Sequence, residues 1–310
     1  MLKFIALFLL LITNFAFAAE EKITVILDWF PNPDQAPLFV AEQAGFFKAQ
    51  NLYVTFISPT DPAEAEKMIA AGKADIGVTY QPSLLQKVTS GLPLVRIATI
   101  INSPLNCLVT LKENNINKIA DLKNKTIGYS TPGTDNIMLL SMLKTASMSE
   151  KDINLINVHF DLVQALLAKK IDAFTGAMRN LEPIQITMLK KNVVVFYPEK
   201  YGFPKYDELI LIANKKKIND PIFKKFVFAL KQGTAYLLAN PEASWQQFAQ
   251  NHPEANSDLN HKIWFGTLKY FAKDPAYLDK NQYENFAAFL LQNKLIPFAP
   301  KLEDYTIDIK

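Results

Sequence analysis

The chain has 310 residues, of which 49% are hydrophobic and 20% are charged. This length and apolar content favour a globular protein of about two domains. The formal net charge of +3 is small and evenly spread, which argues against a nucleic-acid-binding protein. No GxGxxG, P-loop, GxSxG or HExxH motif occurs, and no histidine, cysteine and acidic residues share metal-ligand spacing. We therefore expect neither a cofactor nor a metal.

The first eighteen residues have the pattern of a secretory signal peptide. Lys3 supplies the positive end, residues 4–12 form the apolar core, and residues 16–18 have the small-x-small form of a cleavage site. The apolar core is too short to cross a membrane as a helix. We expect cleavage after Ala18 and, in a bacterium, export of the mature protein to the periplasm.

Strand-like and helical segments alternate after the signal peptide. A helix over 61–72 is predicted by Asp61 as its N-cap, Pro62 in its first turn and Gly72 beyond its end. The alternation predicts parallel sheets covered by helices, and the chain is mostly helical from Asp220 onward. Strand-like runs lie at residues 22–27, 52–57, 74–78, 94–101, 107–111, 126–129, 153–158, 172–176, 193–197 and 208–213.

Two similar segments indicate an internal repeat. Residues 68–80 and 165–178 each contain the end of a helix, a Lys-x-Asp turn and a short strand with a glycine, Gly77 in one and Gly176 in the other. The repeat predicts two similarly built α/β lobes. Because ligands bind beyond the carboxyl ends of the strands in such sheets, the loops after these glycines are candidate binding edges.

Seven segments, in this order, resemble the ABC-transporter substrate-binding proteins for thiamine pyrimidine precursors. The Asp-Trp-x-Pro-Asn and Tyr-Gln-Pro elements are typical of this branch, which is related to a eukaryotic thiamine pyrimidine synthase family. The Gly-Phe-Phe and Gly-x-x-Asp-x-Gly elements are shared with nitrate, sulfonate and taurine binders. The segments are LDWFPN (27–32), AGFFKAQNL (44–52), AAGKADIGVTYQPS (70–83), SPLN (103–106), KTIGYSTPGT (125–134), KKIDAFTGAMRNLE (169–182) and FALKQGTAYLLANPEASWQQF (228–248).

The resemblance implies an α/β, two-lobe, type II periplasmic binding fold, with a mixed and mostly parallel sheet flanked by helices in each lobe. Lobe I would comprise residues 19–105 and 210–310, and lobe II residues 106–209. Hinge crossings are expected near 102–108 and 205–212, where proline and polar residues suit a change of backbone angles.

The implied function is that of a non-enzymatic receptor. It would bind N-formyl-4-amino-5-aminomethyl-2-methylpyrimidine or hydroxymethylpyrimidine between its lobes, close, and present the closed lobes to the permease of an ABC importer. The imported pyrimidine would serve thiamine salvage. We expect a monomer, because a closing receptor of two lobes needs no partner subunit.

A pyrimidine needs an aromatic surface on each face and carboxylates or amides on its edge. Trp29 is predicted to supply one face and Tyr80, followed by Gln81, another. Asp28 and Asn32 are predicted to bond the edge or to hold the proline-rich loop. Further ligand-facing residues implied by the resemblance are Asn106, Tyr129, Gly133 and Thr134 at a helix start, Asn180, Glu182 and Tyr206.

These residues have structural alternatives. Trp29 and Tyr80 alternatively belong to the core, and Asp28 caps the following turn. Glu182 is alternatively a solvated acid at the start of a helix, ahead of Pro183. Arg179 suits the surface better than a ligand contact, and Trp245 and Trp264 suit the core.

Two other functions compete with the pyrimidine receptor. Synthase relatives place a lysine and a histidine after the Gly-x-Asp-x-Gly strand and cysteines near the second hinge. Here residues 78–83 contain neither lysine nor histidine, and residues 204–209 contain no cysteine. Cys107 suits a small buried residue. A receptor for another ligand is the second alternative: riboflavin also uses aromatic faces and edge acids, whereas sulfonate or nitrate calls for cationic or hydroxyl groups.

Overall fold

A computed structural model describes residues 20–309, so the predicted signal peptide lies outside the described residues. The described chain contains two sheets of five strands, in the orders β2-β1-β3-β10-β4 and β7-β6-β8-β5-β9. The strands are β1 (Glu21–Ile26), β2 (Leu52–Ile57), β3 (Ile76–Thr79), β4 (Leu94–Ile101), β5 (Asn106–Leu111), β6 (Thr126–Tyr129), β7 (Asn154–Asn157), β8 (Ala173–Met178), β9 (Val193–Phe196) and β10 (Leu209–Asn214).

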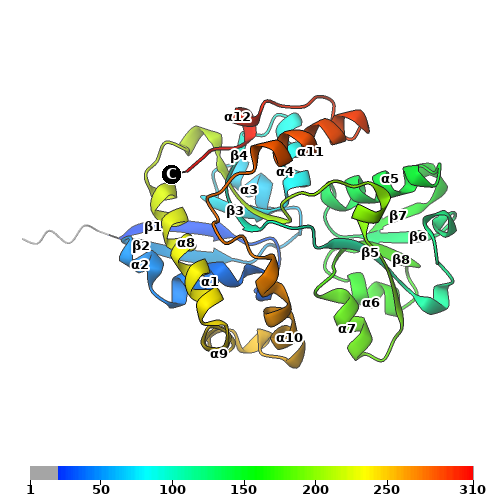
Figure 1. Cartoon of the computed structure of the whole chain (residues 1–310), viewed down its shortest axis with the longest axis horizontal. Coiled ribbons are helices and arrows are strands. Elements are labelled where there is room, and N and C mark those ends of the chain that lie inside the picture. Colours follow the sequence, from blue (N-terminus) through cyan, green and yellow to red (C-terminus); the bar gives the residue numbers. More distant parts are fainter. Residues whose placement is uncertain (1–19, 310) are drawn as a thin grey trace, which may run out of the picture.

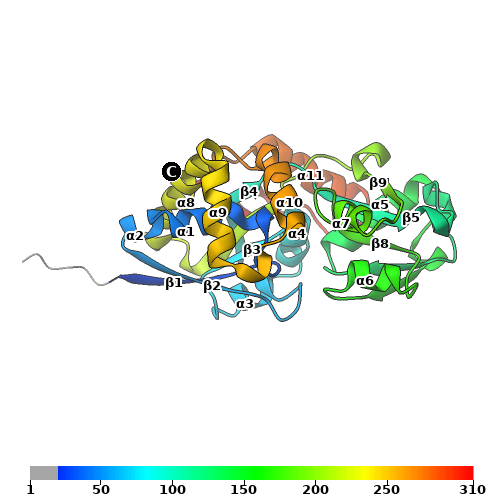
Figure 2. The same ribbon diagram turned by 90° about the horizontal axis from the view of Figure 1, so that it is seen from below.

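The two sheets define two halves of the molecule that lie side by side along its longest axis (Figures 1 and 2). We call the part built on β1–β4 and β10 the first half, and the part built on β5–β9 the second half. Helices α1–α4 and α8–α12 lie in the first half, and α5–α7 in the second (Figure 1). They are α1 (Ala36–Gln43), α2 (Phe46–Ala49), α3 (Ala65–Ala70), α4 (Gln81–Thr89), α5 (Thr134–Thr145), α6 (Leu162–Leu167), α7 (Glu182–Met188), α8 (Ile222–Ala239), α9 (Pro241–Asn251), α10 (Asp258–Thr267), α11 (Lys280–Gln292) and α12 (Leu302–Tyr305).

Both sheets are mixed and share one topology. In each sheet four strands point the same way and one is reversed: β10 runs antiparallel to β3 and β4, and β5 to β8 and β9. The predicted mixed, mostly parallel sheets are confirmed. The reversed strand in each sheet directly follows a crossing from the other half, at residues 102–105 before β5 and 197–208 before β10. The predicted limits of the lobes and of the hinge stay a prediction.

The repeated Lys-x-Asp turn has the same structural role in both halves. The Asp75 carboxylate accepts the Thr24 N–H of β1 at 2.9 Å, and the Asp172 carboxylate accepts the Thr126 N–H of β6 at 2.8 Å. Each aspartate thus satisfies a backbone donor of a neighbouring strand in its sheet. The following strands, β3 and β8, occupy the same central position of the two sheets. The internal similarity therefore reflects two equivalent βα units.

The helix predicted over 61–72 begins three residues later than its N-cap signal suggests, because the N-cap is Glu64 rather than Asp61. Asp61 accepts the Ala63 N–H, and the Glu64 carboxylate accepts both the N–H and the hydroxyl of Thr60. These bonds stabilise a turn ahead of α3, because short acidic side chains bond the local backbone in turns as readily as at helix starts. Gly72 does follow the helix, with φ of +69°.

The predicted C-terminal helices are confirmed as α8 to α11. Trp245 and Trp264, expected in the core, are buried in the core of the first half, and Cys107 is buried in the second. Among the described residues, no helix is long and apolar enough to cross a membrane.

Candidate functional site

A narrow cavity of about 40 Å³ lies between the two halves. Its walls come from the segments that follow β1, β3, β6, β7 and β8 at their carboxyl ends, where such sheets bind ligands, and from both crossings. The crossings contribute Leu105 and Glu208, and the strands that follow them, β5 and β10, contribute their first residues, Asn106 and Leu209. The cavity is therefore lined by both sheets and by the two segments that connect them.

The loop after β1 is held rigidly against β3. The Asp28 carboxylate accepts the Gln35 side-chain amide and the Tyr80 hydroxyl, each at 2.8 Å. Asn32 caps the short 3₁₀ turn Pro33–Gln35 by accepting the Asp34 N–H, and the Gln35 side chain accepts the Asn32 N–H in return. Asp28 and Asn32 thus both line the cavity and hold the loop. Burial raises the pKa of Asp28.

Trp29 lies at the mouth of the cavity rather than in the core. Its indole is half-buried and meets Phe160 of the second half edge-on, with 4.6 Å between ring centroids. Phe30 contacts the same ring at 4.9 Å. Next to them, the His159 ring and the Asp61 carboxylate lie 3.1 Å apart across the same boundary. Trp29 is therefore placed by both halves.

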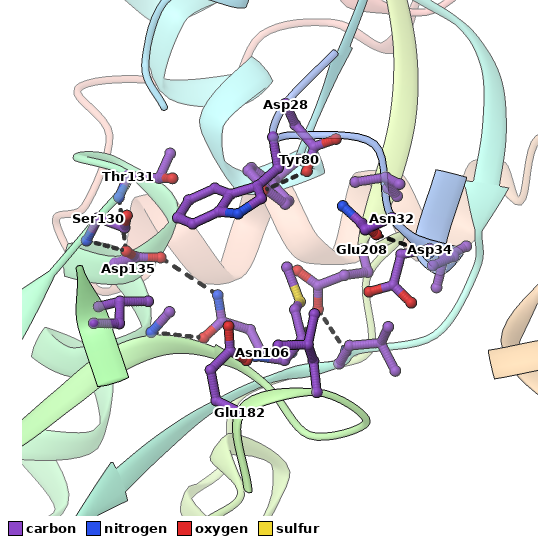
Figure 3. A pocket seen from close by; sticks show the side chains of 18 residues that line it. Asp28, Asn32, Asp34, Tyr80, Asn106, Ser130, Thr131, Asp135, Glu182 and Glu208 are labelled. Atoms are coloured by element: carbon purple, nitrogen blue, oxygen red, sulfur yellow. Dashed lines mark hydrogen bonds between the residues drawn. The ribbon is translucent and has the colours of Figure 1, made fainter. Parts of the chain in front are cut away.

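The wall of the cavity as a whole is acidic. Five carboxyl groups line it, and among the described lining residues there is no lysine, arginine or histidine. Figure 3 shows the carboxyl groups of Asp34, Asp135, Glu182 and Glu208 around one space with the amide of Asn106. Arg179, expected at the surface, is half-buried and pairs with Glu199 at 2.7 Å, outside the lining. The site therefore suits a ligand rich in hydrogen-bond donors.

Glu208 has one carboxyl oxygen that the protein leaves without a partner. Its Oε2 accepts the N–H groups of Leu105 and Asn106 and the Tyr206 hydroxyl, the last two at 2.7 and 2.9 Å. Its Oε1 is buried and accepts no hydrogen bond. Burial raises the pKa of Glu208 to about 7. A buried acceptor without a donor is costly, and a ligand donor would relieve that cost.

Asp135 occupies the backbone donors of the loop after β6. Its Oδ2 accepts the N–H groups of Ser130 and Thr131, at 2.9 and 2.8 Å. Gly176 in β8 has φ of +90°, and a Cβ there would lie 2.4 Å from Asp135. Burial raises the pKa of Asp135 to about 6. The N–H groups of this loop thus hold the chain's own carboxylate.

Asn180 connects the halves instead of lining the cavity. Its Nδ2 donates to the Asp34 carboxylate and to the Thr267 hydroxyl of α10, each at 2.7 Å. Thr267 also donates to Asp34, at 3.0 Å. Burial raises the pKa of Asp34 to about 6. Because Asp34 lines the cavity, this hydrogen-bonded cluster links the cavity wall to the contact between the halves.

Glu182 lies in the cavity wall at the first turn of α7. Its carboxylate accepts the Met178 N–H at 2.7 Å, and its side chain is buried. Burial raises the pKa of Glu182 to about 8. The alternative of a solvated helix acid is therefore wrong. Pro183 lies in the first turn of α7, where the fixed backbone angle of a proline suits the start of a helix.

Six of the twelve predicted site residues line the cavity, and six do not. The six that line it are Asp28, Trp29, Asn32, Tyr80, Asn106 and Glu182. The other six support it: Gln81 accepts the Asp207 N–H, Tyr206 holds Glu208 from the core, and Gly133 packs against Gln86 of α4. Thr134 is buried beside it, Tyr129 ends β6, and Asn180 connects the halves.

Three acids and one aromatic residue of the site escape sequence reasoning. Asp34 lies only two residues beyond the recognised loop motif, and Asp135 directly follows the predicted helix start. Glu208 lies in the predicted hinge segment, directly before an apolar strand-like run, and an acid at that place was a usable signal. Phe160 carries no local signal, since its role depends on contact with Trp29 from the other half.

The comparisons with known proteins agree on one family. The family model described as NMT1/THI5 like matches residues 32–244. A Haemophilus influenzae protein provisionally named for thiamine biosynthesis is 45% identical over 94% of this chain and 93% of its own. The formylaminopyrimidine-binding protein of Halalkalibacterium halodurans is 30% identical over 79% of this chain and 75% of its own. A Saccharomyces cerevisiae 4-amino-5-hydroxymethyl-2-methylpyrimidine phosphate synthase is 28% identical over 82% and 78%.

Solved structures show the fold. The alkanesulfonate-binding protein of Xanthomonas axonopodis pv. citri aligns with a TM-score of 0.74 at 15% identity, covering 94% of this chain and 99% of its own. The periplasmic aliphatic sulphonate-binding protein of Escherichia coli gives 0.68 at 14%, covering 94% of each chain. The predicted type II periplasmic binding fold is confirmed.

Proposed function

The chain belongs to the NMT1/THI5 like family, and from this premise we propose that it is the substrate-binding protein of an ABC importer for a thiamine pyrimidine precursor. The proposed ligand is N-formyl-4-amino-5-aminomethyl-2-methylpyrimidine or hydroxymethylpyrimidine, bound in the cavity between the halves. The proposed location is the periplasm, reached through the signal peptide predicted in residues 1–18. The proposed partner is the importer's permease, and the proposed state is a monomer.

The chemistry of the cavity carries this proposal. An aminopyrimidine is flat, with an amino donor on its edge. The cavity combines the rings of Trp29 and Tyr80 with five carboxyl groups, so it suits both the faces and the edge of such a ring. The Halalkalibacterium halodurans relative is named as a formylaminopyrimidine-binding protein, which supports the same ligand class.

The acidic wall argues against an anionic ligand. The structural neighbours named for sulfonates share the fold at 14–15% identity, which carries no ligand to this chain. Here the Asp135 carboxylate already accepts the Ser130 and Thr131 N–H groups, and a sulfonate or nitrate would meet five carboxyl groups without a cation. Riboflavin would require the halves to separate much further than a single ring does, since the cavity has only about 40 Å³.

The synthase relatives raise the question of catalysis. Among the described residues that line the cavity there is no lysine, histidine or cysteine. The thiol of Cys107 is buried and donates to the Ala177 carbonyl, and burial raises its pKa well above its ordinary value. A thiol in this state is a poor nucleophile. The receptor function is therefore the better supported of the two.

The proposed mechanism is closure around the ligand. The chain crosses between the halves twice, and the end of each crossing brings a polar side chain to the cavity: Asn106 directly follows the first crossing, and Glu208 ends the second. A ligand that bonds both crossings and Trp29 would favour the closed arrangement, because it contacts both halves only there. The permease would then recognise the closed form.

Native mass spectrometry followed by calorimetric titration tests this function. The protein, isolated gently from the periplasm, is titrated with formylaminopyrimidine, hydroxymethylpyrimidine, thiamine, riboflavin and ethanesulfonate. We expect a pyrimidine to bind, and Trp29→Ala to weaken it at least tenfold, because a stack worth about 1 kcal/mol is lost together with buried area. Trp245→Phe, in the core, is the matched control. Binding of riboflavin or the sulfonate alone would refute the proposed ligand.

A further inference from the structure

We propose that the cavity holds its ligand as a cation, with a protonated ring nitrogen donating to Oε1 of Glu208. This inference rests on the proposed function, because it concerns the charge state of an aminopyrimidine in the same cavity. Such a ring is basic, since the amino group donates electron density to the ring nitrogens. Proton uptake gives its edge an additional N–H donor beside the conjugated amino group.

The unpaired oxygen of Glu208 is the first observation. Among the described residues, Glu208 Oε1 is the one carboxyl oxygen that is buried and without a hydrogen-bond partner. The other oxygen of this group is held by three protein donors, so the carboxyl is fixed in orientation while Oε1 is left free. Glu208 lines the cavity. A fixed, unsatisfied carboxyl oxygen in a cavity wall indicates a ligand donor at this point.

The charge of the surroundings is the second observation. The loop after β1 contributes Asp28 and Asp34, the end of β3 contributes Tyr80, α5 contributes Asp135 and α7 contributes Glu182. All of these groups except Tyr80, whose hydroxyl donates to Asp28, are carboxylic acids. Arg179 lies outside the lining, where its guanidinium pairs with Glu199 and stacks on Tyr197. Among the described residues that line the cavity, no cation balances the carboxylates.

The other carboxyl groups are largely committed to the protein. Asp28 accepts hydrogen bonds at both oxygens, from Gln35 and Tyr80. Asp135 accepts from backbone N–H groups and from the Asn106 amide. These bonds compensate two of the five acids, but nothing compensates Oε1 of Glu208. A neutral aminopyrimidine offers this oxygen only its amino group, whereas the cation offers a ring N–H donor together with a positive charge.

The proton comes from one of two sources. When Glu208 is ionised before binding, the ligand takes a proton from solvent. When Glu208 is protonated, its proton passes to the ring nitrogen and no net uptake occurs. The raised pKa of Glu208, about 7, places the change between these regimes near neutral pH. Affinity is then expected to fall about tenfold per pH unit well above pH 7, where each binding event removes one proton from solvent.

Nitrogen NMR locates the proton. The probe is 4-amino-5-hydroxymethyl-2-methylpyrimidine labelled with ¹⁵N in the ring, bound to the full mature chain at pH 8. We expect the bound ring nitrogen to resonate where the free ligand resonates in acid. Glu208→Gln keeps the carbonyl that accepts the three protein donors and replaces Oε1 by an amide, so it is expected to weaken binding about tenfold or more and to abolish the cation signal.

Asp207→Asn is the matched control. Asp207 is the neighbouring buried acid, bonded to Thr99, Gln282 and Tyr283, and it does not line the cavity. This variant is expected to leave the bound ¹⁵N signal unchanged. A neutral ring signal in the wild-type complex overturns the inference while leaving the proposed function intact, even if both variants misfold. Failure of any pyrimidine to bind overturns the proposed function itself.

Discussion

The contact between Asn180 and Asp34 gives the sharpest prediction about closure. Asn180→Ala removes two hydrogen bonds of 2.7 Å that reach from the second half to Asp34 and Thr267 of the first. Asp34 is mostly ionised at pH 7.5, since its pKa is about 6. A hydrogen bond to a charged group contributes about 1.5–3 kcal/mol, which corresponds to a loss of about 10- to 150-fold in ligand affinity if the bond forms only on closure.

Small-angle X-ray scattering with and without hydroxymethylpyrimidine, together with calorimetric titration, measures this effect. We expect the variant to be more open with subsaturating ligand and to bind more weakly. Asn214→Ala is the matched control: Asn214 is also buried, but it donates to Ile69 and Ala70 within the first half. The control should lower the melting temperature without changing closure.

The pH dependence separates this contact from a mere packing effect. Below pH 6 the Asp34 carboxyl becomes protonated, and the contact with Asn180 becomes a bond between neutral groups. Its contribution then falls to about 0.5–1.5 kcal/mol. The affinity ratio between wild type and Asn180→Ala should therefore shrink as the pH decreases from 7.5 to 5. An unchanged affinity and an unchanged scattering profile in the variant would refute the closure role of Asn180.

Three further predictions concern residues in or next to the cavity wall. Phe160→Ala should raise the dissociation rate of hydroxymethylpyrimidine about 2- to 10-fold in stopped flow, because the edge contact with Trp29 is lost; Phe228→Ala, at the surface, should not. Gly176→Ala should cost about 1–3 kcal/mol in urea unfolding, through its positive φ and its collision with Asp135. Without ligand, stability should decrease as the pH rises from about 4.5 to 8, because folded Glu182 keeps a proton that the unfolded chain releases; Glu182→Gln should flatten this dependence, and a rising curve would contradict it.

The elements of the fold were largely predictable because their signals are local. All ten strands of the described chain lie where apolar, β-branched runs occur. Strands β2, β4 and β6 agree with their predicted ranges to the residue. The start of α3 was not predictable, because acidic residues such as Asp61 and Glu64 occur both at helix caps and in the turn that precedes a helix. The reversed strands β5 and β10 were not separable by pattern either, since burial on both faces gives the same apolar run in either direction.

The residues of the candidate site also differ in how far they could be predicted, depending on whether their signal is local. Asp28, Trp29 and Asn32 belong to one continuous motif, and a contiguous segment is visible in a sequence. Asn180 was recognised as important, but its partners Asp34 and Thr267 are separated from it by 146 and 87 residues. Its role as a connection between the halves therefore depends on the three-dimensional arrangement. Glu208 has the same difficulty, since what makes it distinctive is an absent partner.

Asp135 shows how one framework can serve ligands of opposite charge. Two consecutive N–H groups before a helix form a site that attracts anions in proteins generally. In this chain the side chain of Asp135, on the helix itself, fills that site and gives the wall a negative charge. Gly176 is then required, because any side chain there would collide with the Asp135 carboxylate. A change of ligand class thus needs few substitutions, provided that an acid fills the anion site and the opposite strand leaves room for it.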